Sequence, residues 1–583
     1  MNTDNALSQD KKQIASSRRD LRQKAVEWLL QRIPIIVMAF LVLYPISMLF
    51  YGSFWSASRI TSPGYLTINN FITVLKSPRV ISAIVNTFWV TLGTTGISVL
   101  FGVPLAWLVT RTNMPGRNRV KTVTMLPFFT SSLLVGVSWA LLLSPEIGLF
   151  NNLFSSLGLP RLNIFSIGGL IWATGLYHVP YMFLFAYPAF QSIDSSLEES
   201  SQILGANVFT TFRKITFPLI MPSIVSGAIL VAVSSIGLFG IVAILGTPKG
   251  IFMLTNFIQR QVASFPVKHN IAAAASMLLL VGTFIFIAIQ RRFIAKENKR
   301  FVTVSGKVPR ARTVDLGKWR WPAAGVYSLF ILVGVLLPYF ILVIVSLSDY
   351  WSGSISLKTL TMANYHDLFF GSYAAQVRSA FSNSMLLGVG AATISVAICL
   401  IIAWVINRGT GWFKVIAEFL AMAPVAVPGI VFGVAFLWAW IRFPIQIYGT
   451  LWILIIAYVT RTIPHCTRVL GSNMIQISKD LEESARVAGA SWMRILKDIV
   501  FPLLKPGLLA AWAFVFILSI KELNTSILLV TPKTNVIATL VYDIYQEGFY
   551  VKLSALVVIE SAMIIITLAA FEYILKGKFM SDK

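Results

Sequence analysis

The sequence is poor in cysteine and in charged residues, and each shortage excludes a class of protein. Only two of its 583 residues are cysteine, Cys399 and Cys466, and both lie within or at the end of apolar runs. Neither a disulfide framework nor a thiolate metal site can be built from them, so we interpret both as packing residues. Charged residues make up 12% of the chain, whereas soluble domains usually carry about 25%. A water-soluble globule is therefore excluded.

Signs of catalysis are also missing. No Gly-x-x-x-x-Gly-Lys-Ser/Thr phosphate loop occurs, although Lys307 and Lys318 each follow a glycine. The histidines are dispersed without metal-ligand spacing, and we interpret them as packing or interfacial residues: His178, His269, His366 and His465. We expect no catalytic residue, no metal site and no cofactor bound by this chain, which should not hydrolyse ATP itself.

The chain is rich in apolar runs. Apolar residues make up 56% of it and its mean hydropathy is +0.76, and runs such as 33–54 and 271–289 exceed or approach the roughly 20 helical residues that cross a bilayer. Because helices also satisfy the backbone inside lipid, we predict an all-α polytopic membrane protein. About twelve crossings are expected, starting near Ile33, Ala83, Lys121, Ile167, Leu219, Ile271, Pro322, Ala380, Val415, Ile447, Leu508 and Leu553.

The net charge of +25 reflects topology rather than a nucleic-acid partner, because Lys and Arg are spread between the apolar runs. The basic N-terminus, the loop 111–121 and the connector before residue 320 share one side if each run crosses once. The positive-inside rule makes that side the cytoplasm. We therefore predict a cytoplasmic tail (1–32), a six-helix half (33–293), a basic linker (294–320), a second six-helix half (321–583) and two cytoplasmic termini, with membrane lipids as surroundings.

The two halves repeat each other in sequence. The segment 105–111, Leu-Ala-Trp-Leu-Val-Thr-Arg, recurs 297 residues later as Ile-Ala-Trp-Val-Ile-Asn-Arg, and Pro127 recurs as Pro424. Farther along, Thr247-Pro248-Lys249 recurs 284 residues later. The change of offset predicts an insertion in the first half, in the loop 144–166. Duplication alone also fits secondary carriers built of two six-helix halves.

A motif in the loop after the fourth crossing of each half distinguishes these classes. It lies near 193–222 and near 477–506, and its acidic, small, glycine, isoleucine and proline positions have identical spacing: Glu199, Ser200, Gly205, Ile215 and Pro218, and then Glu483, Ser484, Gly489, Ile499 and Pro502. Each glycine can take the left-handed conformation that ends one helix and turns the chain. Each proline is expected in the first turn of the next membrane helix.

These loops resemble the EAA loops of permeases of binding-protein-dependent ABC importers. The sequence departs from that pattern with Ser for the first Ala in both loops, Ser201 for the second Ala, and Phe for the Leu before the proline. The resemblance implies a type I importer permease in the bacterial inner membrane. It also implies a separate ATPase in two copies, with one docking loop for each copy, and a periplasmic or lipid-anchored substrate-binding protein. A secondary carrier driven by an ion gradient would not need such loops. The sequence also contains no catalytic motif that would indicate a membrane-embedded enzyme.

Within these permeases, the fused arrangement is similar to that of iron(III) and 2-aminoethylphosphonate importers. The similarity is carried by Arg-Thr-Asn-Met-Pro-Gly-Arg at 111–117, Leu-Pro-Phe-Phe at 126–129, Leu-Phe-Gly at 238–240 and Leu-Gly-Thr-Pro at 245–248. These segments do not separate ferric iron from an organophosphonate. We expect ferric iron as the solute, with 2-aminoethylphosphonate or another small organophosphate or polar solute as the alternative. Carboxylates suit a hard cation, and the pathway candidates are Lys521, Glu522 and Glu560. Alternatively, Lys521 pairs with one of these glutamates as a structural bridge, or the charges lie near the headgroups.

Overall fold

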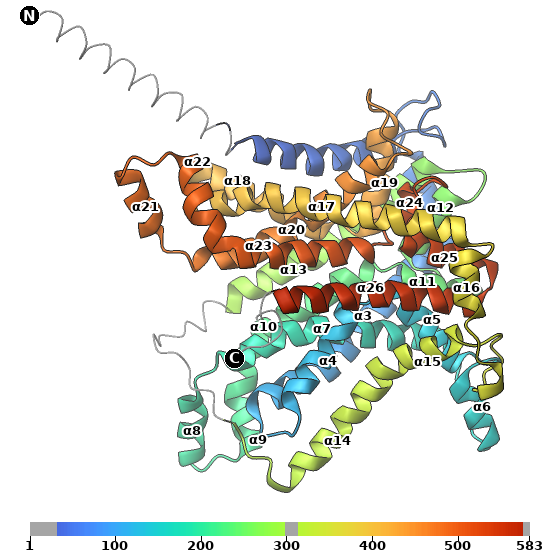
Figure 1. Ribbon diagram of the computed structural model, residues 1–583, viewed down its shortest axis with the longest axis horizontal. Helices are drawn as coiled ribbons and strands as arrows, with labels where there is room; N and C mark the ends of the chain where they lie inside the picture. The colour runs from blue at the N-terminus through green and yellow to red at the C-terminus, as the bar shows by residue number, and fades with distance from the viewer. Residues whose placement is uncertain (1–28, 30–31, 298–312, 575–583) are drawn as a thin grey trace, which may run out of the picture.

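The computed structural model describes residues 29, 32–297 and 313–574, so the predicted tail and most of the predicted linker lie outside the described residues. Within these ranges every regular element is a helix, and extended pairing is limited to three isolated bridges. The predicted all-α fold is confirmed. Figure 1 shows the helices running side by side as one bundle.

The first half contains one helix or bent helix pair for each predicted crossing. In chain order these are Arg32–Ser53, α3 (Pro78–Arg111), α4 (Arg117–Phe129) with α5 (Ser132–Leu143), α7 (Ile167–Gln191), α10 (Phe217–Ile236) and α13 (His269–Glu297). Shorter helices connect them: α2 (Asn69–Lys76), α6 (Leu149–Ser156), α8 (Ser195–Ile203), α9 (Val208–Thr211), α11 (Gly240–Leu245) and α12 (Leu254–Ala263). Helix α6 forms within the predicted insertion.

The second half repeats this order. Its long elements are α14 (Arg320–Ile331) continuing into α15 (Leu337–Ser346), α17 (Ala374–Arg408), α18 (Gly411–Met422) with α19 (Gly429–Ile441), α20 (Leu451–Ile475), α23 (Phe501–Ile520) and α26 (Tyr550–Ile574). Its short helices are α16 (Ala363–Phe370), α21 (Lys479–Val487), α22 (Trp492–Ile495), α24 (Ser526–Leu529) and α25 (Ile537–Glu547). By length and composition, eight described helices can cross a membrane, or eleven if each of three bent pairs is one span.

The third crossing of each half is not the straight helix that its apolar run suggested. The axes of α4 and α5 differ by 103°, and those of α18 and α19 by 108°. In the first half the hydroxyl of Ser131 accepts from the Leu133 N–H and caps α5. In the second, Val427 precedes Pro428 and is extended, as a residue before proline tends to be. These local stops create two breaks inside the bundle.

As predicted, Pro218 and Pro502 lie in the first turn of the fifth crossings, where each is the second residue of α10 or α23. Each helix also continues without a break, within the spans 209–236 and 492–520, from a π-helical segment, Phe212–Thr216 or Leu496–Val500. A proline ring would collide with the carbonyl four residues earlier in a regular α-helix. The wider π turn moves that carbonyl away, so the helix continues through the proline.

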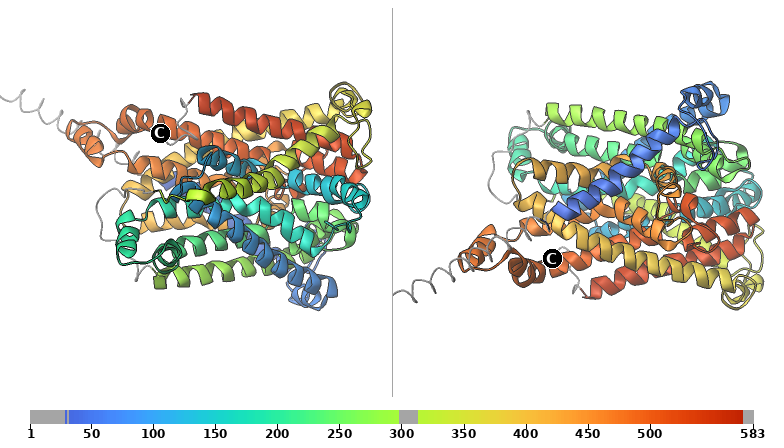
Figure 2. Two further views of the ribbon diagram at one scale, coloured as in Figure 1. Left: turned by 90° about the horizontal axis from the view of Figure 1, so that it is seen from below. Right: turned by 90° about the horizontal axis from the view of Figure 1, so that it is seen from above.

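Each half contacts the other half through its first crossing. Tyr44 in the first helix donates to the Ala439 carbonyl of α19 at 3.0 Å. Tyr327 in α14 donates to the Phe101 carbonyl of α3 at 3.2 Å, and Phe330 stacks on Phe101. Each first crossing therefore packs against the opposite half, and the views in Figure 2 show these two helices on opposite faces of the bundle.

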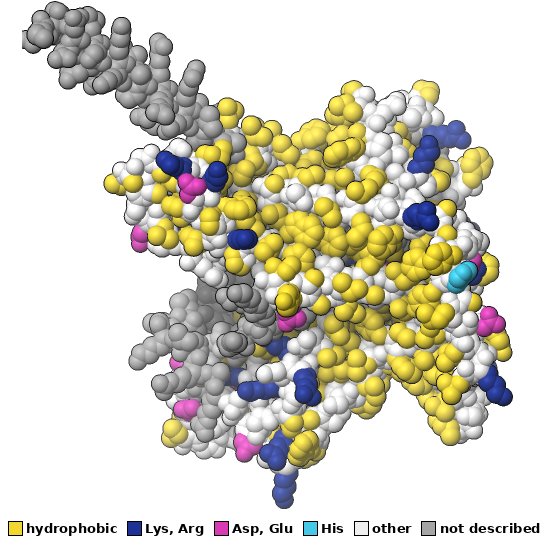
Figure 3. Space-filling view, in the orientation of Figure 1, with side chains coloured by type: hydrophobic (Ala, Val, Ile, Leu, Met, Phe, Trp, Pro, Cys, Tyr) yellow, Lys and Arg dark blue, Asp and Glu magenta, His cyan; other side chains and the backbone are white. Residues whose placement is uncertain are grey.

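Surface character divides the molecule into a middle and two ends. Figure 3 shows apolar side chains over the middle of one face, with Lys, Arg, Asp and Glu mostly toward its ends. The short helices lie at one end, here named the loop end, as two separate pairs, α8 with α9 and α21 with α22, and α6 and α16 lie at the opposite end (Figure 1). An apolar belt between polar ends is the surface expected of a chain that crosses a bilayer.

Candidate functional site: two exposed loops and a buried charged centre

Each motif loop folds as the predicted helix, turn and second helix. Helix α8 ends before Gly205, whose φ is +84°, and α21 ends before Gly489, whose φ is +82°. The backbone N–H of each following alanine, Ala206 or Ala490, bonds back to the carbonyl of residue 201 or 485. This pattern is a Schellman-type C-cap, which favours glycine.

The loop-end tips expose side chains of matching character. Ile203 and its counterpart 284 residues later, Val487, are 85% and 90% exposed. Phe209 and its counterpart Met493 are also exposed. An exposed apolar cluster repeated at equivalent places is typical of a surface that binds another protein.

The predicted loop residues are divided between surface and interior. The exposed ones are Ser200, Gly205, Glu483, Ser484, Gly489 and Pro502, and the half-buried ones are Glu199, Ile215, Pro218 and Ile499.

The glutamate before each motif glutamate, which sequence analysis did not single out, points inward. Glu198 forms an ion pair with Arg111 at 3.2 Å, and Glu482 forms one with Arg408 at 2.8 Å. The sequence did contain a signal for these pairs, because segment 105–111 and its repeat in the second half both end in an arginine, Arg111 or Arg408.

The predicted pathway charges lie between the halves, together with an arginine that sequence analysis missed. The Glu522 carboxylate pairs with Arg461 of α20 at 2.6 Å. The Lys521 ammonium, just after α23, donates to the Phe128 carbonyl beside the α4–α5 break. The first-half residue equivalent to Lys521 is Gly237, which lies against Pro428 at the other break. The end of each fifth crossing thus meets the broken crossing of the opposite half.

Glu560 of α26 stands apart from these bonds. It is 1% exposed, and neither carboxylate oxygen has a hydrogen-bond partner among the described residues. No described salt bridge joins Lys521 to Glu560 or to Glu522. The bridge that the sequence left open as an alternative forms instead between Glu522 and Arg461.

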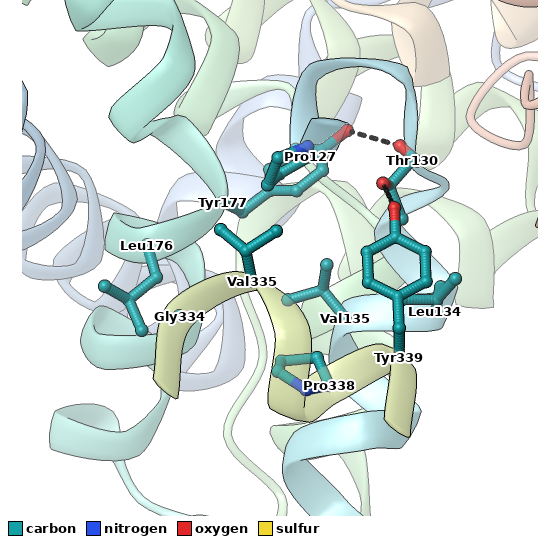
Figure 4. Close-up of a pocket in the computed structure, with 10 residues that line it drawn as sticks. All are labelled: Pro127, Thr130, Leu134, Val135, Leu176, Tyr177, Gly334, Val335, Pro338 and Tyr339. Atoms are coloured by element: carbon teal, nitrogen blue, oxygen red, sulfur yellow. Dashed lines mark hydrogen bonds between the residues drawn. The ribbon is translucent and has the colours of Figure 1, made fainter. Parts of the chain in front are cut away.

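A narrow cavity lies beside the α4–α5 break. Figure 4 shows Tyr339 of α15 reaching Thr130, while Tyr177 of α7 lies beside Pro127; the Tyr339 and Thr130 hydroxyls are hydrogen-bonded. The remaining lining is mostly apolar, and the full set is Pro127, Thr130, Leu134, Val135, Leu176, Tyr177, Gly334, Val335, Pro338 and Tyr339. The break, the seventh crossing and the fourth crossing therefore meet around a few hydroxyl groups.

His178 and the two cysteines are buried, as packing residues would be, whereas His366 and His465 are exposed. His178 bonds through its ring nitrogens to the Thr174 carbonyl and the Ser234 hydroxyl, and both thiols are free and buried. Among the described residues, no group of three or more His, Cys, Asp or Glu side chains could hold a metal ion.

Comparison with known proteins identifies the family. The model for binding-protein-dependent transport system inner membrane components matches residues 98–299 and 395–577, one match in each half. The chain belongs to this family. It is accordingly a transport permease and a multi-pass inner-membrane protein, and the two matches contain the two motif loops.

Relatives of the permease cover most of its length. A ferric transport system permease protein, FbpB, of Actinobacillus pleuropneumoniae is 28% identical over 88% of this chain and 73% of its own length. The Fe(3+)-transport system permease protein FbpB 2 of Haemophilus influenzae is 25% identical over 82% of this chain and 87% of its own length. The sulfate transport system permease protein CysW of Escherichia coli is 30% identical, but it matches 38% of this chain.

Proposed function

We propose that this permease forms the membrane pathway of an ABC importer that carries ferric iron. A binding protein delivers the solute at one face of the membrane, and a separate ATPase, in two copies, drives import from the other. The observation that carries this proposal is the similarity to ferric permeases across more than four-fifths of the chain, including both halves. The sulfate permease matches a much smaller share of it.

The two motif loops support docking of two ATPase copies. Each presents an exposed apolar tip, Ile203 or Val487, on a helix-turn-helix. The proposed docking residues are those of the motif, with Glu199 and Glu483 as acidic contacts for basic side chains. Since the sequence has no phosphate loop, ATP is used by the partner, and the permease itself binds no cofactor.

Orientation follows from the same loops. Docking to a soluble ATPase puts the loop end in the cytoplasm, and the basic segment 111–121 lies next to it at the end of α3. This agrees with the positive-inside rule. Both chain termini are then cytoplasmic, and the α6 and α16 end faces the binding protein.

The pathway is proposed to pass between the halves at the broken crossings. There Glu522, Glu560 and several hydroxyl groups supply oxygen atoms, the donors that hard cations prefer. Arg461 neutralises the Glu522 carboxylate when no cation is present. The close packing of Lys521 against Phe128 and of Arg461 against Glu522 fits a closed pathway.

Transport by reconstituted vesicles tests the proposal. Vesicles contain this chain, the ATPase and the binding protein, and uptake is measured with ferric ion, 2-aminoethylphosphonate and sulfate, each with and without ATP. Ferric uptake that requires ATP and the ATPase is expected, while the purified chain alone hydrolyses no ATP. ATP-driven uptake of the phosphonate or of sulfate, without uptake of iron, would make that solute the substrate in place of ferric iron. Uptake by the chain alone along a proton or sodium gradient would replace the importer with a secondary carrier.

A further inference from the structure

Two buried ion pairs join the motif loops to the longest helices of the bundle. Arg111 is the last residue of α3 and pairs with Glu198 of α8, and Arg408 is the last residue of α17 and pairs with Glu482 of α21. The arginine side chains are 1% and 9% exposed, and the glutamates 13% and 6%. The arginines are related by the offset of 297 and the glutamates by 284, so the structure brings together equivalent partners in both halves.

The second-half pair ties three elements at one point. Both carboxylate oxygens of Glu482 bond to α17, one to Nε of Arg408 at 2.8 Å and the other to Nε1 of Trp404 at 3.1 Å. Arg408 also donates through Nη2 to the Ile477 carbonyl at 2.7 Å and to the Met474 carbonyl at 3.4 Å, at the end of α20. Helix α21 therefore cannot tilt without straining its bonds to α17.

The first-half pair is looser. Glu198 lies 3.2 Å from Arg111, but its other oxygen accepts from the Thr216 hydroxyl, which belongs to the next helix rather than to α3. Arg111 makes one further bond, to the Ile193 carbonyl at 3.3 Å, and its Nε and Nη1 atoms are buried with no partner among the described residues. A single bonded contact thus links α8 to α3.

The connected helices reach far from the loops. Helix α3 has 34 residues and α17 has 35, which corresponds to roughly 50 Å at 1.5 Å per residue. Apart from these pairs, α8 packs mainly on α9 and the following π segment, and α21 on α22. Figure 1 shows α17 running from α21 and α22 toward α16 at the opposite end.

We propose that Arg111–Glu198 and Arg408–Glu482 are joints that transmit movement of the docked ATPase to α3 and α17. This inference rests on the proposed function. The four side chains are positioning residues: they do not meet ATP or the solute, but they make each docking loop move with the second crossing of its half. The Arg408–Glu482 joint is the stiffer one, because losing Glu482 removes two contacts with α17 and losing Glu198 removes one with α3.

Solute imported per ATP hydrolysed is the discriminating measurement. A role in folding alone would lower import and hydrolysis together and leave their ratio unchanged. In vesicles with the ATPase and the binding protein, Glu482→Gln should keep the ATPase bound but lower the ratio by about fivefold or more, a typical coupling effect. Glu198→Gln should lower it less. Glu418→Gln, an exposed change on α18, is the matched control and should leave the ratio unchanged.

A distance measurement on the chain without the Glu→Gln changes tests the proposal even if those variants fail to fold. Spin labels are placed at the exposed Thr410, just beyond α17, and at the exposed Asp480 of α21, and in a second sample at the exposed Ser196 of α8 and Asp480, away from the proposed docking tips. Through the ATP cycle the Thr410–Asp480 distance should change by less than about 2 Å, while the Ser196–Asp480 distance changes more.

The outcomes distinguish failure of the joint proposal from failure of the proposed importer function. An unchanged ratio in a folded Glu482→Gln complex, or a Thr410–Asp480 distance that varies as much as the Ser196–Asp480 distance, overturns the joint while wild-type import stands. Absence of any ATP-driven uptake by the wild-type complex overturns the proposed function instead.

Discussion

Arg461 of α20 and Glu522 after α23 form an ion pair of 2.6 Å against the broken crossing of their own half. Nη1 of Arg461 also donates to the Thr525 hydroxyl at 2.9 Å, and that hydroxyl donates to the Gly429 carbonyl at 3.2 Å. The first-half positions 284 residues earlier are Tyr177 and Leu238, which carry no charge. The two halves therefore share a fold, but the charged contacts at their centre come from the second half.

Gly429 leaves the space that the Arg461 guanidinium occupies. A Cβ at this position would overlap the guanidinium, so Gly429→Ala should displace the ion pair and cost about 1 to 3 kcal/mol, as overpacking does. Gly96→Ala in α3 is the matched control, because a Cβ there meets nothing within 4 Å. Thermal unfolding in detergent measures the difference. Equal stability and equal iron uptake in both variants would show that the glycine is not needed for this contact.

Glu560 should matter more for transport than for stability. Its carboxylate is buried without a described hydrogen-bond partner, and burying such a group costs free energy. Glu560→Gln should therefore keep or raise the unfolding temperature while lowering ferric uptake. A variant with full uptake would remove Glu560 from the proposed pathway, and one that unfolds earlier would make the carboxylate a structural group.

The turn glycines are expected to control ATPase docking. A β-branched residue strongly disfavours the positive φ of Gly205 and Gly489, so Gly205→Val and Gly489→Val should reshape the loops and weaken ATPase copurification without affecting membrane insertion. Asparagine tolerates this conformation better, so Gly489→Asn serves as the control. Normal copurification in both valine variants would mean that the turn is not required.

Glu199 and Glu483 should contribute unequally to the ATPase interface. Glu483 is exposed and Glu199 is half-buried, so Glu483→Gln should lower ATP hydrolysis stimulated by the loaded binding protein more than Glu199→Gln does. The double variant should be worse than either single one, while circular dichroism shows the helices retained. Unchanged stimulated hydrolysis in the double variant would contradict an interface role for both carboxylates.

An ion pair near the α16 end should make stability depend on pH. Hydrogen bonds from Lys552 and Ser372 hold the pKa of Asp367 below its usual range. The carboxylate therefore stabilises the fold above the unfolded-state pKa of about 3.9, and this contribution is lost as pH falls through the lower folded-state pKa. Asp367→Asn should lower the unfolding temperature at pH 7, and the difference from wild type should shrink below about pH 4. A difference that is constant across this range would show that the charge is not responsible.

Much of the architecture follows from the sequence alone. Apolar runs require helices in lipid, so the all-α fold and the crossing positions were predictable, and the internal offsets of 297 and 284 gave the two halves. Gly205 and Gly489 gave the loop turns, because a helix commonly ends at a left-handed glycine. These features depend on local sequence and on the solvent in which the chain folds.

Only the tertiary structure determined how distant residues combine at the centre and at the loops. Sequence analysis singled out Glu199 and Glu483 from the motif, whereas the buried partners of Arg111 and Arg408 are Glu198 and Glu482, one residue earlier on the helix. A single residue turns a helical side chain by about 100°, so the motif cannot show which carboxylate faces inward. The pairing of Glu522 with Arg461 rather than with Lys521 likewise depends on the packing of α20 against α23, since partners 61 residues apart are chosen by folding and not by spacing.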